Sequence, residues 1–113
     1  MPARVMVFAK IKPGEEAAFE AAYAEVTSKV KGTPGHIQDE LLREDGEPGS
    51  YILLSEWESK EAFLAWEDAP IHMNTTTPMR PYWAGRVERK IYQVAHRLQA
   101  QPHTLPHDGV IVG

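Results

Sequence analysis

Apolar residues recur along the chain with two different periods, and these periods predict its first two elements. Between residues 4 and 12 every second residue is apolar, which is typical of a strand, and Pro13-Gly14 ends it. Between Glu15 and Lys31 apolar residues lie three or four positions apart on one stripe, which predicts an amphipathic helix. Gly32 follows as a stop signal for that helix.

The same patterns predict the rest of the domain. In chain order, they indicate strands over residues 36–44 and 50–58 joined by a hairpin loop, a helix over 59–69, a short helix from Pro70 and a long, bulged strand over 82–98. Ser59 is a suitable N-cap for the second helix, because its hydroxyl can accept from a free backbone N–H. Pro78 and Pro81 interrupt the short helix.

The element order β-α-β-β-α-β is that of the α+β ferredoxin-like fold, in which one sheet carries its helices on one face. Met6, Phe8 and the run 52–54 nevertheless place large apolar side chains on the face that such helices leave uncovered. We therefore expect a second copy to pack sheet against sheet, forming a homodimeric α/β barrel. We expect residues 1–98 to form this domain. Residues 99–113 are a C-terminal tail, and one expectation is that it packs on the partner subunit.

Composition narrows the classes of function. The 113 residues include 12 Lys and Arg against 16 Asp and Glu, and a net charge of −4 argues against nucleic-acid binding through a basic face. No apolar run approaches the ~20 residues of a membrane span, and MPARVMVFAK lacks the apolar stretch of a signal peptide, so we expect no membrane partner and a cytoplasmic location. The absence of cysteine excludes thiolate nucleophiles and Cys-based metal sites.

His103 and His107 have the spacing of metal ligands on a helix, but Pro102 and Pro106 interrupt any helix there, so we expect no metal site.

The segment SEWESKEAFLAW, residues 55–66, follows the β-α-β-β pattern and resembles the antibiotic biosynthesis monooxygenase family of dimeric α/β barrels. The likeness covers residues 3–98, and the part from His72 to Trp83 looks closer to members found in bacterial aromatic polyketide pathways. This family includes cofactor-independent, quinone-forming oxygenases, heme-degrading enzymes and proteins with no established activity. The resemblance implies a monooxygenase that oxidises a phenolic or anthrone polyketide intermediate to a quinone in antibiotic or pigment biosynthesis. Dioxygen would be its co-substrate, and it would need no cofactor.

Cofactor-independent oxidation of a phenol or anthrone requires few groups from the protein. A deprotonated phenol or anthrone can itself pass an electron to dioxygen, so the protein supplies an apolar pocket, a base and a cation. The predicted catalytic residues are Trp66, which resembles the family's pocket tryptophan, His72 as base, and Arg80 as cation. Each has a structural alternative, namely core packing for Trp66, a surface position for His72 and an ion pair for Arg80.

Five further residues are predicted to contact the small aromatic substrate: Asn74, Thr76, Tyr82, Trp83 and Phe8. Asn74 and Thr76 offer neutral hydrogen bonds, although capping and turn formation between two prolines is the other account of the threonines. Tyr82 and Trp83 are adjacent on the expected final strand and would face opposite sides, so only one of them would line the pocket.

Two other functions stay open. One is a heme-binding or heme-degrading oxygenase of the same fold. That branch resembles this chain at Trp66. Its iron-binding histidine, however, falls near the position that Thr76 occupies in this chain, and His72 lies about one helical turn before that position. It also has an asparagine on the first strand, and residues 4–12 contain none. The other is a polyketide cyclase or a non-catalytic accessory protein.

Overall fold

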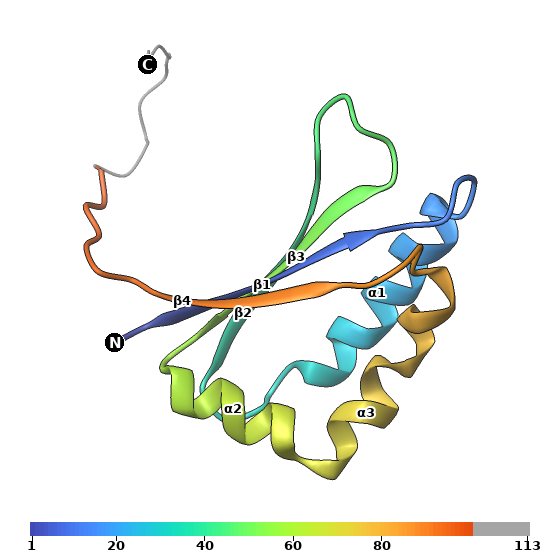
Figure 1. Ribbon diagram of the computed structural model, residues 1–113. Coiled ribbons are helices and arrows are strands. Elements are labelled where there is room, and N and C mark those ends of the chain that lie inside the picture. The colour runs from blue at the N-terminus through green and yellow to red at the C-terminus, as the bar shows by residue number, and fades with distance from the viewer. Residues whose placement is uncertain (101–113) are drawn as a thin grey trace.

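The computed structural model describes residues 1–100, apart from the side chains of Met73 and Asn74. One antiparallel sheet has the strand order β2-β3-β1-β4, and the helices lie together on one of its faces (Figure 1). The elements are, in chain order, β1 (Ala3–Lys10), α1 (Glu16–Val30), β2 (His36–Arg43), β3 (Ser50–Trp57), α2 (Lys60–Asp68), α3 (Pro70–Thr76), the 3-10 helix η1 (Thr77–Tyr82) and β4 (Glu88–Gln93). The prediction of a ferredoxin-like α+β fold is confirmed. Of the expected C-terminal tail, residues 101–113 lie outside the described residues.

Strand β1 lies inside the sheet, between β3 and β4, as its two apolar faces require. Val5 is opposite Ser55 of β3 and Ile91 of β4, and both ladders run without a shift in register. Because side chains alternate along a strand, Val5 and Val7 face the helices while Met6 and Phe8 face the other way. Val5 is buried on the helix side, as the alternation predicts.

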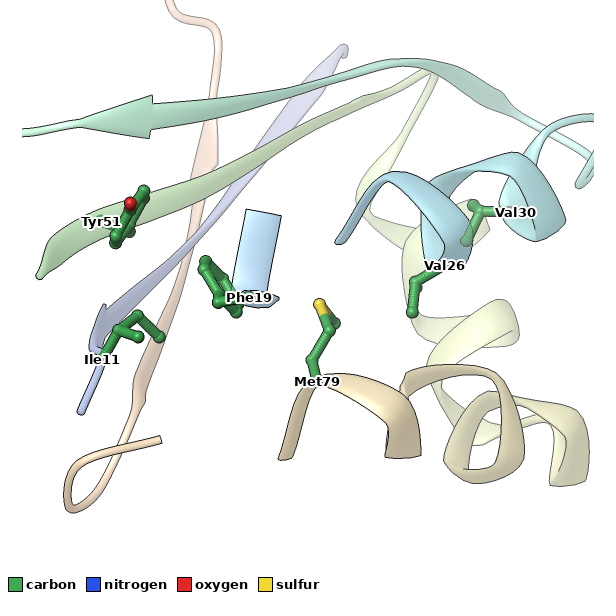
Figure 2. Packing of buried hydrophobic residues seen from close by; sticks show 6 residues of the cluster. All are labelled: Ile11, Phe19, Val26, Val30, Tyr51 and Met79. Atoms are coloured by element: carbon green, nitrogen blue, oxygen red, sulfur yellow. The ribbon is translucent and has the colours of Figure 1, made fainter. Parts of the chain in front are cut away.

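Two clusters of buried side chains attach the helices to the sheet. The cluster at α1 contains Ile11, Phe19, Val26, Val30, Tyr51 and Met79 (Figure 2). The cluster at α2 contains Ala3, Val5, Trp57 and Phe63. Trp66 is partly buried and packs against both of them. Complete burial of one large apolar side chain stabilises the fold by about 1.5–3 kcal/mol, so these contacts hold the helices in place over the sheet.

Helix α2 begins where the sequence predicts and sits close to the sheet. The Ser59 hydroxyl accepts a hydrogen bond from the Ala62 backbone N–H at 3.1 Å, which confirms the predicted N-cap. Gly35 has a positive φ of 82°, and a Cβ at this position would lie 2.5 Å from the Cβ of Ala62. Only glycine therefore allows α2 to approach the turn before β2 so closely.

The predicted final strand is wrong in its length and in its bulge. β4 covers only Glu88–Gln93, because Pro81 lies within η1 and Gly85 adopts a φ of 94° that an extended strand does not use. Strand β4 pairs with β1 without interruption, and the irregularity in register lies instead in β2, between His36 and Gln38. Tyr82 and Trp83 consequently belong to the end of η1 and its C-cap, not to a continuous strand.

The face of the sheet opposite the helices, here called the open face, carries an apolar centre. In the β1–β3 ladder Met6 is opposite Leu54 and Phe8 is opposite Ile52, and Leu42 of β2 lies beyond Ile52. None of the helices in Figure 1 lies over this face. Separately, no helix among the described residues combines the length and apolar character needed to cross a membrane.

Candidate functional site

A cavity of about 260 Å³ lies between the helices and the sheet. Its floor is formed by β1 and β3, and its walls by α1, α2, α3 and the chain from η1 to β4. The apolar part of the lining includes Val5, Val7, Val26, Leu53, Phe63 and Met79. Small-molecule pockets usually measure about 300–1,000 Å³, so this cavity suits one compact ligand. Its mostly apolar walls suit a flat, hydrophobic one.

Trp66 and His72 form one wall of the cavity through a direct ring contact. Their centroids are 4.4 Å apart and their planes are perpendicular, so one ring presents its edge to the face of the other. Trp66 is placed by α2, where it lies one turn after Phe63, with ring centroids 6.4 Å apart. The chain then turns at Ala69, whose carbonyl accepts a hydrogen bond from the His72 backbone N–H at 3.0 Å.

The surroundings of His72 favour its neutral form. Burial lowers the pKa of His72 because an imidazolium loses solvation there, and the Arg80 charge lowers it further, while Glu67 opposes both effects. A neutral imidazole has a ring nitrogen that accepts a proton. His72 is therefore equipped to act as a base on a ligand in the cavity at neutral pH.

Arg80 is held near His72 by a short chain of hydrogen bonds. Its Nη2 donates to the Thr76 hydroxyl at 3.1 Å, and that hydroxyl donates to the His72 carbonyl at 3.1 Å. No carboxylate among the described residues lies within 4.0 Å of the Arg80 guanidinium. Arg80 is exposed and also lines the cavity, and its charge is not committed to an ion pair within the described part of the chain.

The structure brings together five of the eight predicted site residues: Trp66, His72, Thr76, Arg80 and Trp83 all line the cavity. Phe8 does not, because it lies on the open face of the sheet, where its neighbour across the ladder is Ile52. Tyr82 packs against the cluster at α1 outside the cavity lining, and its carbonyl accepts from the Lys12 backbone N–H at 3.0 Å. The side chain of Asn74 is outside the described residues.

Sequence reasoning missed a polar group on the α1 side of the cavity. Tyr23 and Asp39 line it there, and Asp39 Oδ1 lies 2.9 Å from Nε2 of His36. Burial raises the pKa of the Asp39 carboxyl, and the His36 hydrogen bond partly offsets this. Tyr23 has a hydroxyl that is buried without a hydrogen-bond partner in the described part of the chain. The only available signal was a tyrosine within an otherwise apolar helical stripe.

A second missed feature ties α2 to the edge strand β4 at the rim of the cavity. Arg89 contacts Glu67 through two pairs of atoms, Nε to Oε2 at 2.7 Å and Nη2 to Oε1 at 3.1 Å. The same guanidinium lies over the ring of Phe63, 5.6 Å from its centroid. Both charged residues line the cavity, so this pair helps to fix the position of α2.

Within residues 1–100 no group of three or more His, Asp or Glu side chains is arranged to hold a metal ion. His103 and His107, for which the sequence predicts no metal site, lie outside the described residues. The groups that the cavity does present are an aromatic wall, an imidazole whose pKa is lowered by burial, and a guanidinium. Such a set can bind an aromatic molecule, remove a proton from it and stabilise the resulting anion.

Comparison with known proteins assigns the family. SchA of Streptomyces halstedii is 35% identical over 82 residues, which cover 73% of this chain but only 22% of SchA. A mycobilin-producing heme oxygenase of Mycobacterium tuberculosis is 31% identical over 61 residues, covering 54% of this chain and 58% of that protein. The structure of SnoaB from Streptomyces nogalater, a cofactor-independent oxygenase, is similar with a TM-score of 0.72 at 23% identity, covering 88% of this chain and 97% of SnoaB. The profile of the antibiotic biosynthesis monooxygenase family matches residues 2–77, and the chain belongs to that family.

Proposed function

We propose that the protein is a cofactor-independent monooxygenase that oxidises a phenolic or anthrone aromatic polyketide intermediate to a quinone. The observation that carries this proposal is the contact between neutral His72 and Trp66 in an apolar cavity that Arg80 also lines. Membership of the antibiotic biosynthesis monooxygenase family and the similarity to SnoaB support it. The size of the cavity supports a compact aromatic substrate.

The reaction needs four steps, and the chain supplies both a base and a cation for the first. His72 takes the acidic proton of the substrate, and Arg80 stabilises the phenolate or enolate that forms. The electron-rich anion passes one electron to dioxygen, and the two radicals combine through a new carbon–oxygen bond. Loss of water from the resulting peroxide leaves a carbonyl. In balance, one CH2 group and one O2 become one C=O group and one H2O, without an external reductant.

Oxygen consumption with a model anthrone tests this function. With 1,8-dihydroxyanthrone as substrate and a metal chelator present, the protein should consume one O2 per anthraquinone formed, well above the rate in buffer. His72→Ala should abolish most of this increase, and His96→Ala, which removes an exposed histidine outside the cavity, should retain it. An increase that His72→Ala leaves intact would refute the assignment of the base.

We place this activity in a cytoplasmic homodimer assembled through the open face of the sheet. The support is the apolar centre formed by Met6, Phe8, Ile52 and Leu54, a surface of the kind that proteins bury against a partner. Ionic residues border it, with Arg4 Nη2 lying 3.7 Å from Glu56 Oε1. In sedimentation the native chain should exceed its 12.7 kDa monomer mass twofold, and Ile52→Lys should return it to a monomer. A native monomer at micromolar concentration would refute the dimer.

Heme oxygenation is the second candidate, and the mycobacterial relative is the observation that favours it. The residues present fit heme poorly. His72 is the only histidine lining the cavity within the described chain, and its ring packs at 4.4 Å against Trp66. A volume of about 260 Å³ is also small for a porphyrin. Stoichiometric heme binding with a shifted Soret band would favour this candidate, whereas turnover without oxygen consumption would favour a cyclase.

A further inference from the structure

The ion pair between Glu67 and Arg89 at the rim of the cavity is held unusually firmly. Arg89 Nε lies 2.7 Å from Glu67 Oε2, and Arg89 Nη2 donates to Glu67 Oε1 at 3.1 Å. One guanidinium therefore binds both carboxylate oxygens, in the two-point geometry that makes such pairs strong. The guanidinium also lies 5.6 Å from the centroid of the Phe63 ring. The Glu67 side chain is only 23% exposed, so solvent screens its charge less than that of a surface carboxylate.

Glu67 is also a neighbour of the proposed base. It directly follows Trp66 on α2, whose ring contacts the His72 ring at 4.4 Å, and Glu67 and His72 line the same cavity. Burial lowers the pKa of His72, and Glu67 opposes this effect because a carboxylate near an imidazole stabilises the protonated form. A protonated imidazole accepts no proton. A Glu67 carboxylate without a partner would therefore work against the role of His72 as base.

Several elements contribute charged or titratable side chains to the lining around His72. These side chains are Tyr23 of α1, Asp39 of β2, Glu67 of α2, Arg80 of η1 and Arg89 of β4. Within the described part of the chain, the charges that alter the pKa of His72 are those of Glu67 and Arg80, and Arg80 lowers it in the same direction as burial. Arg89 therefore influences His72 through the Glu67 carboxylate that it binds.

We propose that Arg89 is a positioning residue for the base: by binding both oxygens of Glu67, it compensates the charge of that carboxylate and keeps the His72 imidazole able to accept a proton. This inference rests on the proposed function for the role of His72. It adds a means of regulating the same site, because the ion pair joins helix α2 to the edge strand β4. Separation of β4 from α2 would free the carboxylate, so activity at mildly acidic pH depends on the contact between these two elements.

Proton NMR titration of the His72 ring in the full chain tests the role of Arg89. The Cε1–H resonance of His72 is assigned by its loss in His72→Ala, and its midpoint is measured through acidic and neutral pH. Arg89→Met should move the midpoint to higher pH than in the native protein, because Glu67 loses its partner. Lys90→Met removes the same charge from the next residue of β4, whose Nζ lies over the Phe8 ring on the open face, and should leave the midpoint unchanged.

A double variant separates an effect carried by Glu67 from the direct loss of a cation. Removing a cation near an imidazole can raise the pKa of that imidazole by itself. Glu67→Gln should lower the midpoint of His72, and adding Arg89→Met to Glu67→Gln should raise it less than half as far as Arg89→Met raises it in the native chain. A rise of half or more in the Glu67→Gln background overturns the proposal, as does a midpoint in Arg89→Met that equals the one in Lys90→Met.

If Arg89→Met fails to fold, Arg89→Lys takes its place. Lysine keeps the cation but lacks the planar fork that binds both carboxylate oxygens, so the midpoint of His72 should again exceed the native value. An unchanged midpoint in a folded Arg89→Lys protein would then overturn the proposal.

Oxygen uptake with 1,8-dihydroxyanthrone gives a second readout. The ratio of kcat/KM at about pH 6.5 to that at about pH 8 should fall about threefold in Arg89→Met and stay unchanged in Lys90→Met, because a larger fraction of His72 is protonated at the lower pH. The NMR midpoint needs no turnover, so it tests Arg89 even where no oxygen is consumed and the proposed function fails. Conversely, oxygen uptake together with an unmoved midpoint refutes only the role of Arg89.

Discussion

Two tyrosines that contact the region beneath α1 differ in the partners of their hydroxyl groups. The Tyr51 hydroxyl donates to Glu20 Oε2 at 2.7 Å, whereas the Tyr23 hydroxyl is buried without a partner in the described part of the chain. Replacing either residue by Phe removes the hydroxyl and keeps the ring, so the two variants isolate the contribution of those groups. We expect opposite effects on the free energy of unfolding of the ligand-free protein.

The magnitudes follow from the two environments. A hydrogen bond to a charged group contributes about 1.5–3 kcal/mol, but the Glu20 side chain is 42% exposed, so solvent reduces the loss in Tyr51→Phe to about 1 kcal/mol. The edge-to-face contact of Tyr51 with Phe19, at 5.1 Å, is retained. Tyr23→Phe removes the penalty for an unpaired buried hydroxyl, which should raise the free energy of unfolding by about 1 kcal/mol. The two variants should therefore differ by about 2 kcal/mol, or roughly 8 °C in Tm.

Urea unfolding at pH 7 and differential scanning calorimetry on the native chain and both variants provide the measurement. The slope of unfolding against urea should be the same in all three proteins, so that a shift in midpoint reports stability alone. If Tyr23→Phe loses as much stability as Tyr51→Phe, then the Tyr23 hydroxyl already has a partner in the ligand-free protein.

Three further predictions concern the wall that carries the proposed base. Arg80→Leu should lower kcat with 1,8-dihydroxyanthrone by roughly tenfold to a hundredfold with little change in KM, because the anion that it stabilises develops during the reaction; unchanged kcat would remove Arg80 from the site. Native kcat/KM should stay level as the pH is lowered to about 6.5, the ordinary pKa of histidine, and fall only at more acidic pH, because burial lowers the pKa of His72 and protonated His72 accepts no proton. His72→Ala should lack this acid limb in a pH–rate profile, and a limb that persists would assign it to another group. Trp66→Ala should weaken binding of 2-naphthol and reduce the free energy of unfolding by about 3 kcal/mol in urea, since Trp66 is partly buried against both clusters; full retention of stability would exclude its packing role.

Most of the fold could be predicted because its elements have one strong period each. β1 is a short apolar run ended by Pro13-Gly14, and α1 has its apolar stripe between Pro13-Gly14 and Gly32, so tertiary packing and local preference agree. The last part of the chain offered no such agreement. Apolar and aromatic residues from Tyr82 onward resemble a strand, yet Pro81 and Gly85 set backbone angles that end η1 and delay β4 until Glu88.

The candidate site could be predicted only where a residue was out of place in its local pattern. His72 follows Pro70, and Arg80 lies between Pro78 and Pro81, so both stand out as polar residues in a segment interrupted by prolines. Both line the cavity. Tyr23 lies on the apolar stripe of α1, where its ring satisfies the helical pattern, so the pattern gives no sign that this residue lines the cavity. Phe8 is predicted to contact the substrate, although its position in the β1 alternation assigns it to the open face.

Because side chains alternate along each strand, the same strands contribute to both the cavity and the open face of the sheet. On β1, Val5 and Val7 form part of the cavity floor, while Met6 between them belongs to the open face. Neighbouring residues of β1 therefore lie on opposite faces of the sheet. One residue lines the cavity, and the next belongs to the surface available for a second copy. Because the backbone between these side chains is shared, packing against the open face restrains the floor of the cavity as well. Assembly through that face would therefore make the cavity more rigid.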